Sequence, residues 1–354
     1  MLAMLHVIIK EGLHAQDFID AQTVGFEALA ARAADWPPER AAAITGLPAA
    51  SILELGRRLA ETRPTGIRIG IGIQRHAGGG MAVRTITCIP GVTGDWRHPG
   101  GGVCYDTRGF FGQDWAALWR DDLRTRPARA LQMTRLGEGL LEVGDPPVKA
   151  LFVYASNPAA SVPHQTKVLR GLAREDLFTV VAEHFLTDTA RYADIVLPAT
   201  MQIEHQDLLI AYGHLYLSWN EPAAPPPGEC LPHTEMLRRL ARSMGLATEA
   251  LYDSDEAMAR QLLDSGHPSL GGITLEELKA RGWMRLRYPD PFVPFADGFP
   301  TASGRMEFVC ERMAAAGLDP VAGYTPAHET SQRDTALARE YPLALVTPAD
   351  HYLL

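Results

Sequence analysis

The chain has 354 residues, which is enough for two or three domains with a sizeable core. Apolar residues make up 46% of it and charged residues 21%, which excludes a disordered or fibrous protein. The formal net charge of −9 argues against a nucleic-acid-binding protein, and no apolar run approaches the ~18 residues that a membrane span needs.

The first part of the chain predicts helices and then one short strand. Helices are expected over 22–34, 38–46 and 48–59. The β-branched run 67–73 predicts a strand, which is followed by a glycine-rich loop and a helix over 81–92. Residues 106–147 are mixed and polar with several prolines, which indicates a domain boundary.

From residue 148 the pattern changes to alternating strands and helices. Strands are expected over 148–154, 177–181 and 193–198, with a helix over 164–174 between the first two. This order is typical of a parallel sheet with helices on both faces. Further helices are expected over 234–244, 255–264 and 274–282, residues 285–305 are irregular, and 341–347 predicts a new strand.

The four cysteines are scattered at Cys88, Cys104, Cys230 and Cys310. No two have the CxxC spacing that is typical of iron–sulfur and structural zinc sites, so we expect buried thiols and no metal ligated by this chain. The acidic charge and the lack of a disulfide pattern favour a cytoplasmic protein.

The loop after the first predicted strand is the first candidate site. Its glycines let the backbone approach a bulky ligand, and the helix that follows offers free N–H groups to a phosphate. Gln74 could contribute both faces of an amide, and Arg75 a positive charge. The loop lacks a GxGxxG fingerprint, and taken alone it favours a tight structural turn.

Two more candidates follow the strands of the predicted parallel sheet. Asn157 comes after the first strand, at the sheet edge where ligands bind in open α/β folds. Glu183 ends the second strand, where a carboxylate can accept both the N1–H and the exocyclic amine of guanine. The residues alone leave open an ordinary loop with a helix cap near Ser161 and a solvated acid.

Histidines are dense between 164 and 233, and Glu204 with His205 would suit a hydrolytic metal site. Their spacing fits no HExxH-type motif, and the chain has neither a G-x-S-x-G elbow nor a phosphate-binding P-loop. The spacing therefore argues against a metal hydrolase.

Six segments, in this order, resemble the molybdopterin oxidoreductases, the dimethyl sulfoxide reductase and formate dehydrogenase superfamily. They are Ile71 to Gly80, Thr93-Gly94 with Pro99 to Gly102, Ser156 to Ser161, Glu183 to Thr200, Tyr212 to Leu217, and Phe299 to Phe308. The resemblance covers essentially the whole chain.

The resemblance implies an α/β fold with two Rossmann-like parallel-sheet domains, helices on both faces, and the first strand of a C-terminal β-barrel. It places a first, N-terminally truncated cofactor-binding domain at 1–140 and a second, nucleotide-binding βαβ domain at 141–250. A helical and irregular connector would span 251–338, and the barrel would begin at 339–354.

The resemblance also implies a cofactor, in which molybdenum or tungsten is held between two molybdopterin guanine dinucleotides. By motif match, Gly70 and Gln74 contact one dinucleotide and Asn157 the nucleotide of the other. Ala182 and Glu183 fall where a small residue and an acid read the guanosine.

Four other residues complete the set of candidates. His205 stands where many relatives have a lysine, and His233 where many have an aspartate or asparagine. Both are retained as cofactor-binding candidates. Arg75 and His76, beside the pterin loop, are candidates for supporting the groups that contact the cofactor or for handling protons, with loop packing as the alternative.

Members of this family begin with a [4Fe–4S] segment and then a residue that ligates the metal, and neither has a counterpart here. The resemblance therefore implies a central piece of a longer enzyme, inactive by itself, whose parent carries out two-electron chemistry at molybdenum. We expect the pterin cofactor, an unidentified small-molecule substrate and an electron-transfer subunit as its partners. The alternative is a non-catalytic nucleotide-binding scaffold subunit of a redox complex.

Overall fold

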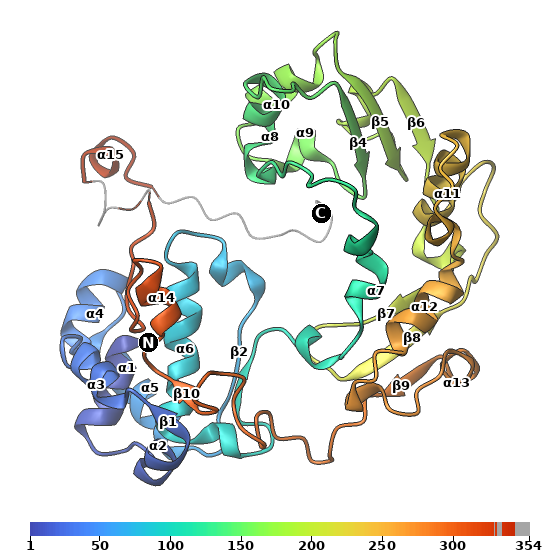
Figure 1. The fold of residues 1–354 in the computed structure, drawn as a ribbon. Helices are drawn as coiled ribbons and strands as arrows, with labels where there is room; N and C mark the ends of the chain where they lie inside the picture. The colour runs from blue at the N-terminus through green and yellow to red at the C-terminus, as the bar shows by residue number, and fades with distance from the viewer. Residues whose placement is uncertain (329, 331–334, 344–354) are drawn as a thin grey trace. The chain divides into compact units, whose positions relative to one another are not determined.

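The structure is a computed structural model that describes residues 1–328, 330 and 335–343. The chain forms two compact units, of which unit 1 combines 1–106 with 288–354 and unit 2 spans 107–287 (Figure 1). None of the helices in the described part of the chain has the length and apolar character needed to cross a bilayer. The sequence predicts domain boundaries near 140, 250 and 338. These boundaries rest on sequence motifs, whereas the two units are defined by their compactness, so the predicted domains stay a prediction.

Unit 1 is built mainly from helices. They are α1 (Leu2–Lys10), α2 (Gln16–Gln22), α3 (Phe26–Ala34), α4 (Pro38–Thr45), α5 (Ala49–Glu61), α6 (Gly79–Thr93), α14 (Glu311–Ala315) and α15 (Thr335–Glu340). Six of the nine residues of α1 are buried, because α3, α4, α5 and α6 pack around it (Figure 1). Ile8, Leu29, Ile89 and Phe308 are fully buried in this core.

Two short parallel strand pairs complete unit 1. Strand β2 (Gly66–Arg68) pairs with β3 (Gly102–Cys104), and β1 (Thr23–Val24) pairs with β10 (Met306–Glu307). The predicted strand over 67–73 was too long, because its partner β3 ends at Cys104 and glycine weakens a strand. The chain instead turns into a 3₁₀ helix at Ile71–Gln74.

Unit 2 contains the predicted parallel sheet, in the order β4 (Ala150–Tyr154), β5 (Phe178–Glu183) and β6 (Ile195–Pro198). Val180 pairs with Phe152 on one side and Ile195 on the other. Helices α8 (Leu136–Leu141), α9 (Pro158–Ser161) and α10 (Gln165–Leu172) lie beside it (Figure 1). The predicted α/β class is confirmed, whereas the expected barrel strand lies largely outside the described residues.

A second sheet in unit 2 was not predicted from the sequence. Strands β7 (Asp207–Leu209), β8 (Tyr216–Asn220) and β9 (Trp283–Arg285) are antiparallel, with Leu217 opposite Met284. The remaining helices of this unit are α7 (Trp115–Trp119), α11 (His233–Ser243), α12 (Asp255–Leu263) and α13 (Leu275–Arg281). The predicted helices over 234–244, 255–264 and 274–282 are confirmed to within one residue at each end.

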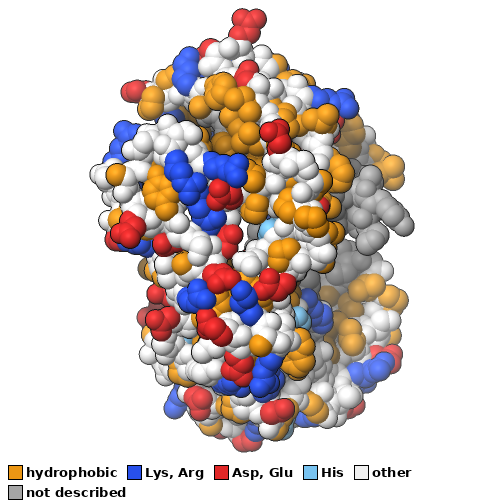
Figure 2. All heavy atoms as spheres, turned by 90° about the vertical axis from the view of Figure 1, so that its right-hand side faces the viewer, with side chains coloured by type: hydrophobic (Ala, Val, Ile, Leu, Met, Phe, Trp, Pro, Cys, Tyr) orange, Lys and Arg blue, Asp and Glu red, His pale blue; other side chains and the backbone are white. Residues whose placement is uncertain are grey.

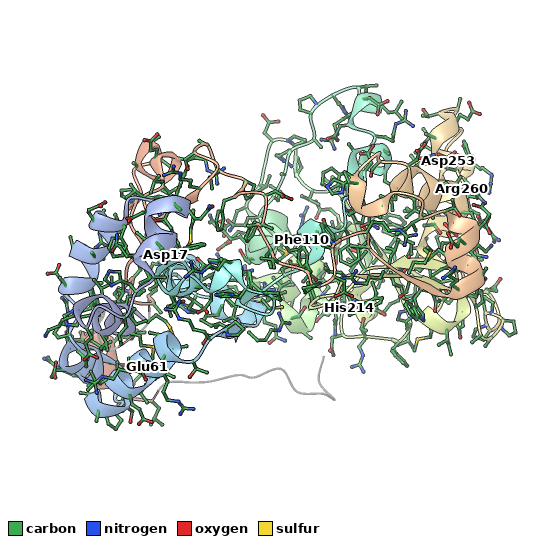
Figure 3. The ribbon with its side chains drawn as sticks, turned by 90° about the horizontal axis from the view of Figure 1, so that it is seen from below. Asp17, Glu61, Phe110, His214, Asp253 and Arg260 are labelled. Atoms are coloured by element: carbon green, nitrogen blue, oxygen red, sulfur yellow. The ribbon has the colours of Figure 1, made fainter. Side chains whose placement is uncertain are left out.

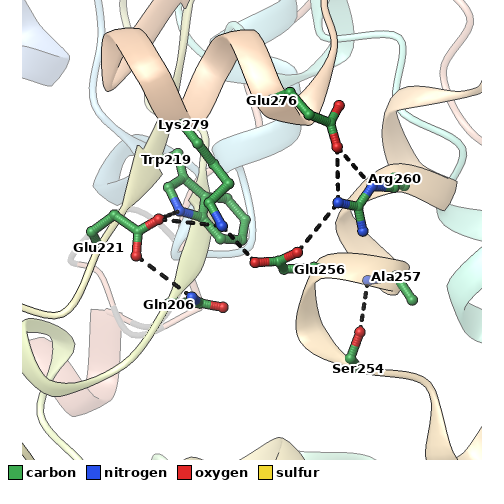
Figure 4. Close-up of polar contacts among 9 residues, drawn as sticks. All are labelled: Gln206, Trp219, Glu221, Ser254, Glu256, Ala257, Arg260, Glu276 and Lys279. Atoms are coloured by element: carbon green, nitrogen blue, oxygen red, sulfur yellow. Dashed lines mark hydrogen bonds and ion pairs between the residues drawn. The ribbon is translucent and has the colours of Figure 1, made fainter.

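Charged side chains tie α12 and α13 to strand β8. Lys279 lies 2.5 Å from Glu256 and 3.6 Å from Glu221, and Arg260 bridges Glu256 and Glu276 (Figure 4). Positive and negative side chains are mixed over the face drawn in Figure 2, so the charges largely neutralise one another there. The network reaches Glu221, the residue directly after β8, and Trp219 of this strand lines a cavity described below.

Candidate functional site

The carboxyl ends of β4, β5 and β6 meet at one edge of the parallel sheet, and the predicted residues of unit 2 lie at or after these ends. Asn157 follows β4, and Ala182 and Glu183 end β5. Ala155, directly after β4, has a φ of +50°, which an alanine rarely adopts. A turn this sharp leads the chain directly from the strand into the Asn157 loop.

Asn157 is held in place by the loop that follows β5. Its side-chain oxygen accepts hydrogen bonds from the Thr189 backbone N–H at 3.1 Å and from the Thr189 hydroxyl at 2.7 Å. The same hydroxyl accepts the N–H of Ala159 at 3.0 Å. The Asn157 side-chain nitrogen has no partner among the described residues, so its two N–H groups are free for a ligand.

Ala182 and Glu183 differ in accessibility. Ala182 is fully buried and packs with Ala199 and Met236, so its side chain is not open to contact with a ligand. Glu183 is half-buried, and one carboxylate oxygen accepts the His184 backbone N–H at 2.7 Å. The other carboxylate oxygen has no partner among the residues that the structure describes.

His205 and His233, predicted separately from the sequence, line the same cavity of about 380 Å³ in unit 2. Its other lining residues are Trp115, Leu118, Gln206, Asp207, Leu208, Trp219, Pro232, Thr234, Asp255, Met258, Ala259 and Leu262. The volume falls in the range of small-molecule sites. The apolar wall with a few polar groups is also typical of them.

The two imidazoles are held in different ways. His205 Nδ1 lies 2.9 Å from the Thr200 hydroxyl, which leaves its Nε2 for other partners. His233 packs its ring 5.5 Å from that of Tyr154 at the end of β4. Its Nε2 is buried and has no hydrogen-bond partner in the described part of the chain. Leaving a buried polar atom without a partner costs free energy, which a hydrogen bond to a ligand would recover.

The predicted loop of unit 1 lies beyond the ends of β2 and β3. Gln74 is exposed, and its side-chain oxygen accepts a hydrogen bond from the Tyr105 hydroxyl. Arg75 and His76 are exposed, and their side chains form no hydrogen bond or ion pair with any described residue. Gly70 is exposed and has open space where a side chain would lie, so a ligand could approach its backbone.

Two other glycines of this loop have packing roles. A Cβ at Gly79 would lie 2.4 Å from the Gln74 backbone, and one at Gly78 would lie 2.1 Å from the Thr325 carbonyl oxygen. Glycine is therefore required where α6 begins, as the tight-turn interpretation of this loop implied.

The metal-hydrolase hypothesis finds no support. Glu204 accepts the Met201 backbone N–H at 2.8 Å and caps a short 3₁₀ helix. No group of three histidine, cysteine or acidic side chains within the described ranges is arranged to hold a metal ion. The sequence analysis did not identify two residues that contact the candidates: Thr189, which binds Asn157, and Tyr154, which packs on His233. Thr189 lies within the segment Glu183 to Thr200 that resembles the family, but nothing in that segment singled it out.

Comparisons with known proteins show the family of this chain. Residues 1–243 match the model of the molybdopterin oxidoreductase family. The probable oxidoreductase YoaE of Bacillus subtilis is 42% identical over 92% of this chain and 48% of its own length. The dimethyl sulfoxide reductase DmsA of Escherichia coli is 26% identical over 97% of this chain and 49% of its own length.

The fold agrees as well. The solved structure of acetylene hydratase from Pelobacter acetylenicus superposes with a TM-score of 0.75 at 25% identity, covering 97% of this chain and 51% of that one. The chain thus spans about half the length of the relatives it matches. The residues matched by the family model, 1–243, include every candidate site residue. The chain belongs to the molybdopterin oxidoreductase family.

Proposed function

We propose that the carboxyl edge of β4, β5 and β6 binds the nucleotide end of a molybdopterin guanine dinucleotide. The supporting observation is that one edge carries a positioned amide donor at Asn157 and an open carboxylate oxygen at Glu183. Within the same unit, two imidazoles share a cavity large enough for a purine.

Guanine recognition would rest on Glu183. A carboxylate can accept both the N1–H and the exocyclic amine of guanine, whereas adenine offers a different pattern of donors and acceptors. The hydrogen bond from His184 N–H orients the Glu183 carboxylate and leaves acceptor capacity for the base. Ala182 beside it adds no side-chain bulk that would keep a ring away.

Asn157, His205 and His233 would bind the remaining polar atoms of the nucleotide. Because Thr189 occupies the Asn157 oxygen, the amide nitrogen is fixed as a donor and suits a phosphate or ribose oxygen. The unpartnered Nε2 of His233 and the free Nε2 of His205 can exchange hydrogen bonds with a base or sugar.

In unit 1, Gly70 and Gln74 would contact a second dinucleotide. Beside the pterin, the His76 imidazole would hold or move a proton, and Arg75 would supply a permanent positive charge. The bound group supplies two-electron redox chemistry at molybdenum. The proposal includes a cytoplasmic parent enzyme that holds a [4Fe–4S] cluster in another segment and passes electrons to a partner subunit. By itself this chain would be inactive.

Nucleotide titrations test the base recognition. We expect GDP to bind the chain about tenfold more tightly than IDP, which lacks the exocyclic amine, and more tightly again than ADP. Glu183→Gln should lower GDP affinity at least about tenfold and bring the GDP/IDP ratio close to one. Isothermal titration calorimetry measures each affinity.

Glu175→Gln is the matched control, because Glu175 is an exposed acid that precedes β5 at the opposite edge of the same sheet. It should leave all three affinities unchanged. Equal binding of GDP, IDP and ADP, or equal losses in the two variants, would overturn the proposal.

The scaffold alternative predicts the same nucleotide binding without metal. Molybdenum analysis of the full-length parent, co-expressed with the enzymes that assemble the pterin, separates the two. Metal retained with the parent supports the oxidoreductase, and nucleotide without molybdenum supports the scaffold. We expect little or no molybdenum on the present chain alone.

A further inference from the structure

Unit 1 contains a cavity of about 430 Å³ that shares no residue with the Gly70–His76 loop. It lies between α2, the 3₁₀ helix Asp95–Arg97 and the loop 293–299. The lining residues are Asp17, Phe18, Ala21, Gln22, Trp96, Arg97, Val293, Phe295, Ala296 and Phe299. The volume is in the range of small-molecule sites.

Flat aromatic rings form most of the wall. Phe295 and Phe299 stack with their centroids 4.9 Å apart, and Trp96 meets Phe295 edge-on at 5.3 Å. Phe18 is buried in the same cluster. Rings of this kind bind best to another planar, apolar ring, through stacked or edge-to-face contacts.

The wall contains a buried donor without a partner. Trp96 is only 8% exposed, and its indole N–H has no hydrogen-bond partner among the described residues. Gly102 lies against the Cε3–Cζ3 edge of the indole, where a Cβ would come within 2.5 Å, so the edge with Nε1 faces away from β3. Such a donor calls for an acceptor.

The backbone at the same place is strained. Phe295 has a φ of +60°, a conformation that is an outlier for a bulky residue and persists only where the surroundings enforce it. Gly298, three residues later, has a φ of +109°, which only glycine adopts readily. The surroundings therefore hold the loop that carries two rings of the wall in this one conformation.

The charges of the lining residues cancel. Arg97 forms an ion pair with Asp17 at 2.5 Å, and its guanidinium lies 5.7 Å from the Phe18 ring (Asp17 is labelled in Figure 3). Because the two charges at the mouth of the cavity are paired, the mouth attracts neither anions nor cations strongly: a charged ligand would meet both the positive and the negative group.

We propose that this cavity binds an uncharged, planar aromatic molecule that carries a hydrogen-bond acceptor, which the Trp96 indole N–H recognises. The aromatic wall selects for a flat ring, and the unpaired donor selects for the acceptor. The neutral mouth selects against charge.

Three probes of similar shape separate these requirements. Isoquinoline, at a mildly alkaline pH where it is uncharged, offers an acceptor nitrogen, indole offers a donor, and N-methylisoquinolinium is a cation. We expect isoquinoline to bind the 354-residue chain saturably and at least about tenfold more tightly than either of the others, because each mismatch leaves a polar group unpaired. Calorimetry gives these affinities without any substitution.

Nuclear magnetic resonance identifies the site. The indole ¹H–¹⁵N signal of Trp96, recognised by its loss in Trp96→Phe, should move downfield with isoquinoline and saturate at the calorimetric affinity. In Trp96→Phe, which keeps an aromatic wall, isoquinoline should lose its advantage over indole. Equal binding of isoquinoline and indole, tighter binding of the cation, or a Trp96 signal that isoquinoline leaves unmoved would overturn the proposal.

Discussion

The two predicted cofactor-binding edges differ in how far the chain has already fixed their polar groups. In unit 2, Asn157 accepts two hydrogen bonds from Thr189. The Thr189 side chain is buried, and its hydroxyl also accepts the backbone N–H of Ala159. In unit 1, the Gln74 side chain accepts one hydrogen bond from Tyr105 at the surface, and the side chains of Arg75 and His76 have no partner among the described residues.

The difference indicates two kinds of ligand site. An edge whose donors are already oriented loses little conformational entropy when a nucleotide binds, so more of the contact energy becomes affinity. The exposed loop of unit 1 would have to order its side chains on binding, which costs about 0.5–1.5 kcal/mol for each long side chain. We therefore expect unit 2 to bind its nucleotide more tightly than the unit 1 loop.

The largest effect should come from Thr189→Val, which breaks the fixed edge of unit 2. Valine keeps the shape of threonine, but it leaves the N–H of the fully buried Ala159 without an acceptor and removes one donor to Asn157. We expect the free energy of unfolding to fall by about 3 kcal/mol in urea titrations.

Thr187→Val is the control within the same loop. The Thr187 hydroxyl accepts one long bond of 3.3 Å, from Ala190 N–H, and the residue is half-buried. A loss below about 1 kcal/mol is expected. Equal losses for the two variants would contradict the view that Thr189 fixes this edge.

The second prediction concerns α6, the helix that follows the unit 1 loop. Burial raises the pKa of the Cys88 thiol on α6 from 9.0 to about 12. Between these pH values the unfolded chain loses the thiol proton while the folded chain keeps it, so the folded state binds more protons. This contribution to stability is complete below pH 9.0 and is lost as pH rises toward about 12.

Urea midpoints measured over this range should therefore fall more steeply for the wild type than for Cys88→Ala. The difference should approach about 1.4 kcal/mol per pH unit, the value for one proton. Parallel pH profiles would show that the Cys88 thiol is not shielded from water in the folded chain, and the contrast between an exposed loop and a packed helix would fail.

The parallel sheet of unit 2 could be predicted from the sequence because each of its strands is a short apolar or β-branched run. Proline ends the third, and the rule that ligands bind at carboxyl edges placed Asn157 and Glu183 on one edge. The antiparallel strands β7 and β9 could not be predicted, because each has only three residues. Both pair with β8, which is mixed in composition and, for β9, distant in sequence.

The bonding of the candidate residues was also beyond the sequence. Asn157 and Thr189 are 32 residues apart, and nothing in either motif states that one side chain occupies the oxygen of the other. The shared cavity of His205 and His233 depends on where α11 begins relative to the loop after β6. Family resemblance supplied both histidines as candidates without placing them together.

The third prediction sharpens the comparison at Ala155, whose φ of +50° turns the chain from β4 into the Asn157 loop. Ala155→Gly should stabilise the chain by about 0.5–1 kcal/mol, because glycine adopts this conformation without strain. Ala160→Gly, at an exposed helical position of α9, should destabilise it by a similar amount. The same sign for both changes in thermal and urea unfolding would show that Ala155 is unstrained.

The smallest effect should come from the side-chain hydrogen bond between Tyr105 and Gln74 in the unit 1 loop. Tyr105→Phe removes the hydroxyl that donates to Gln74, and both groups can turn to water instead because the bond lies at the surface. We expect a change below about 0.5 kcal/mol, and a similarly small coupling energy in a double-mutant cycle with Gln74→Leu. A coupling above about 1.5 kcal/mol, comparable with a buried bond, would mean that unit 1 fixes its amide as firmly as unit 2 does, and the contrast between the two edges would be lost.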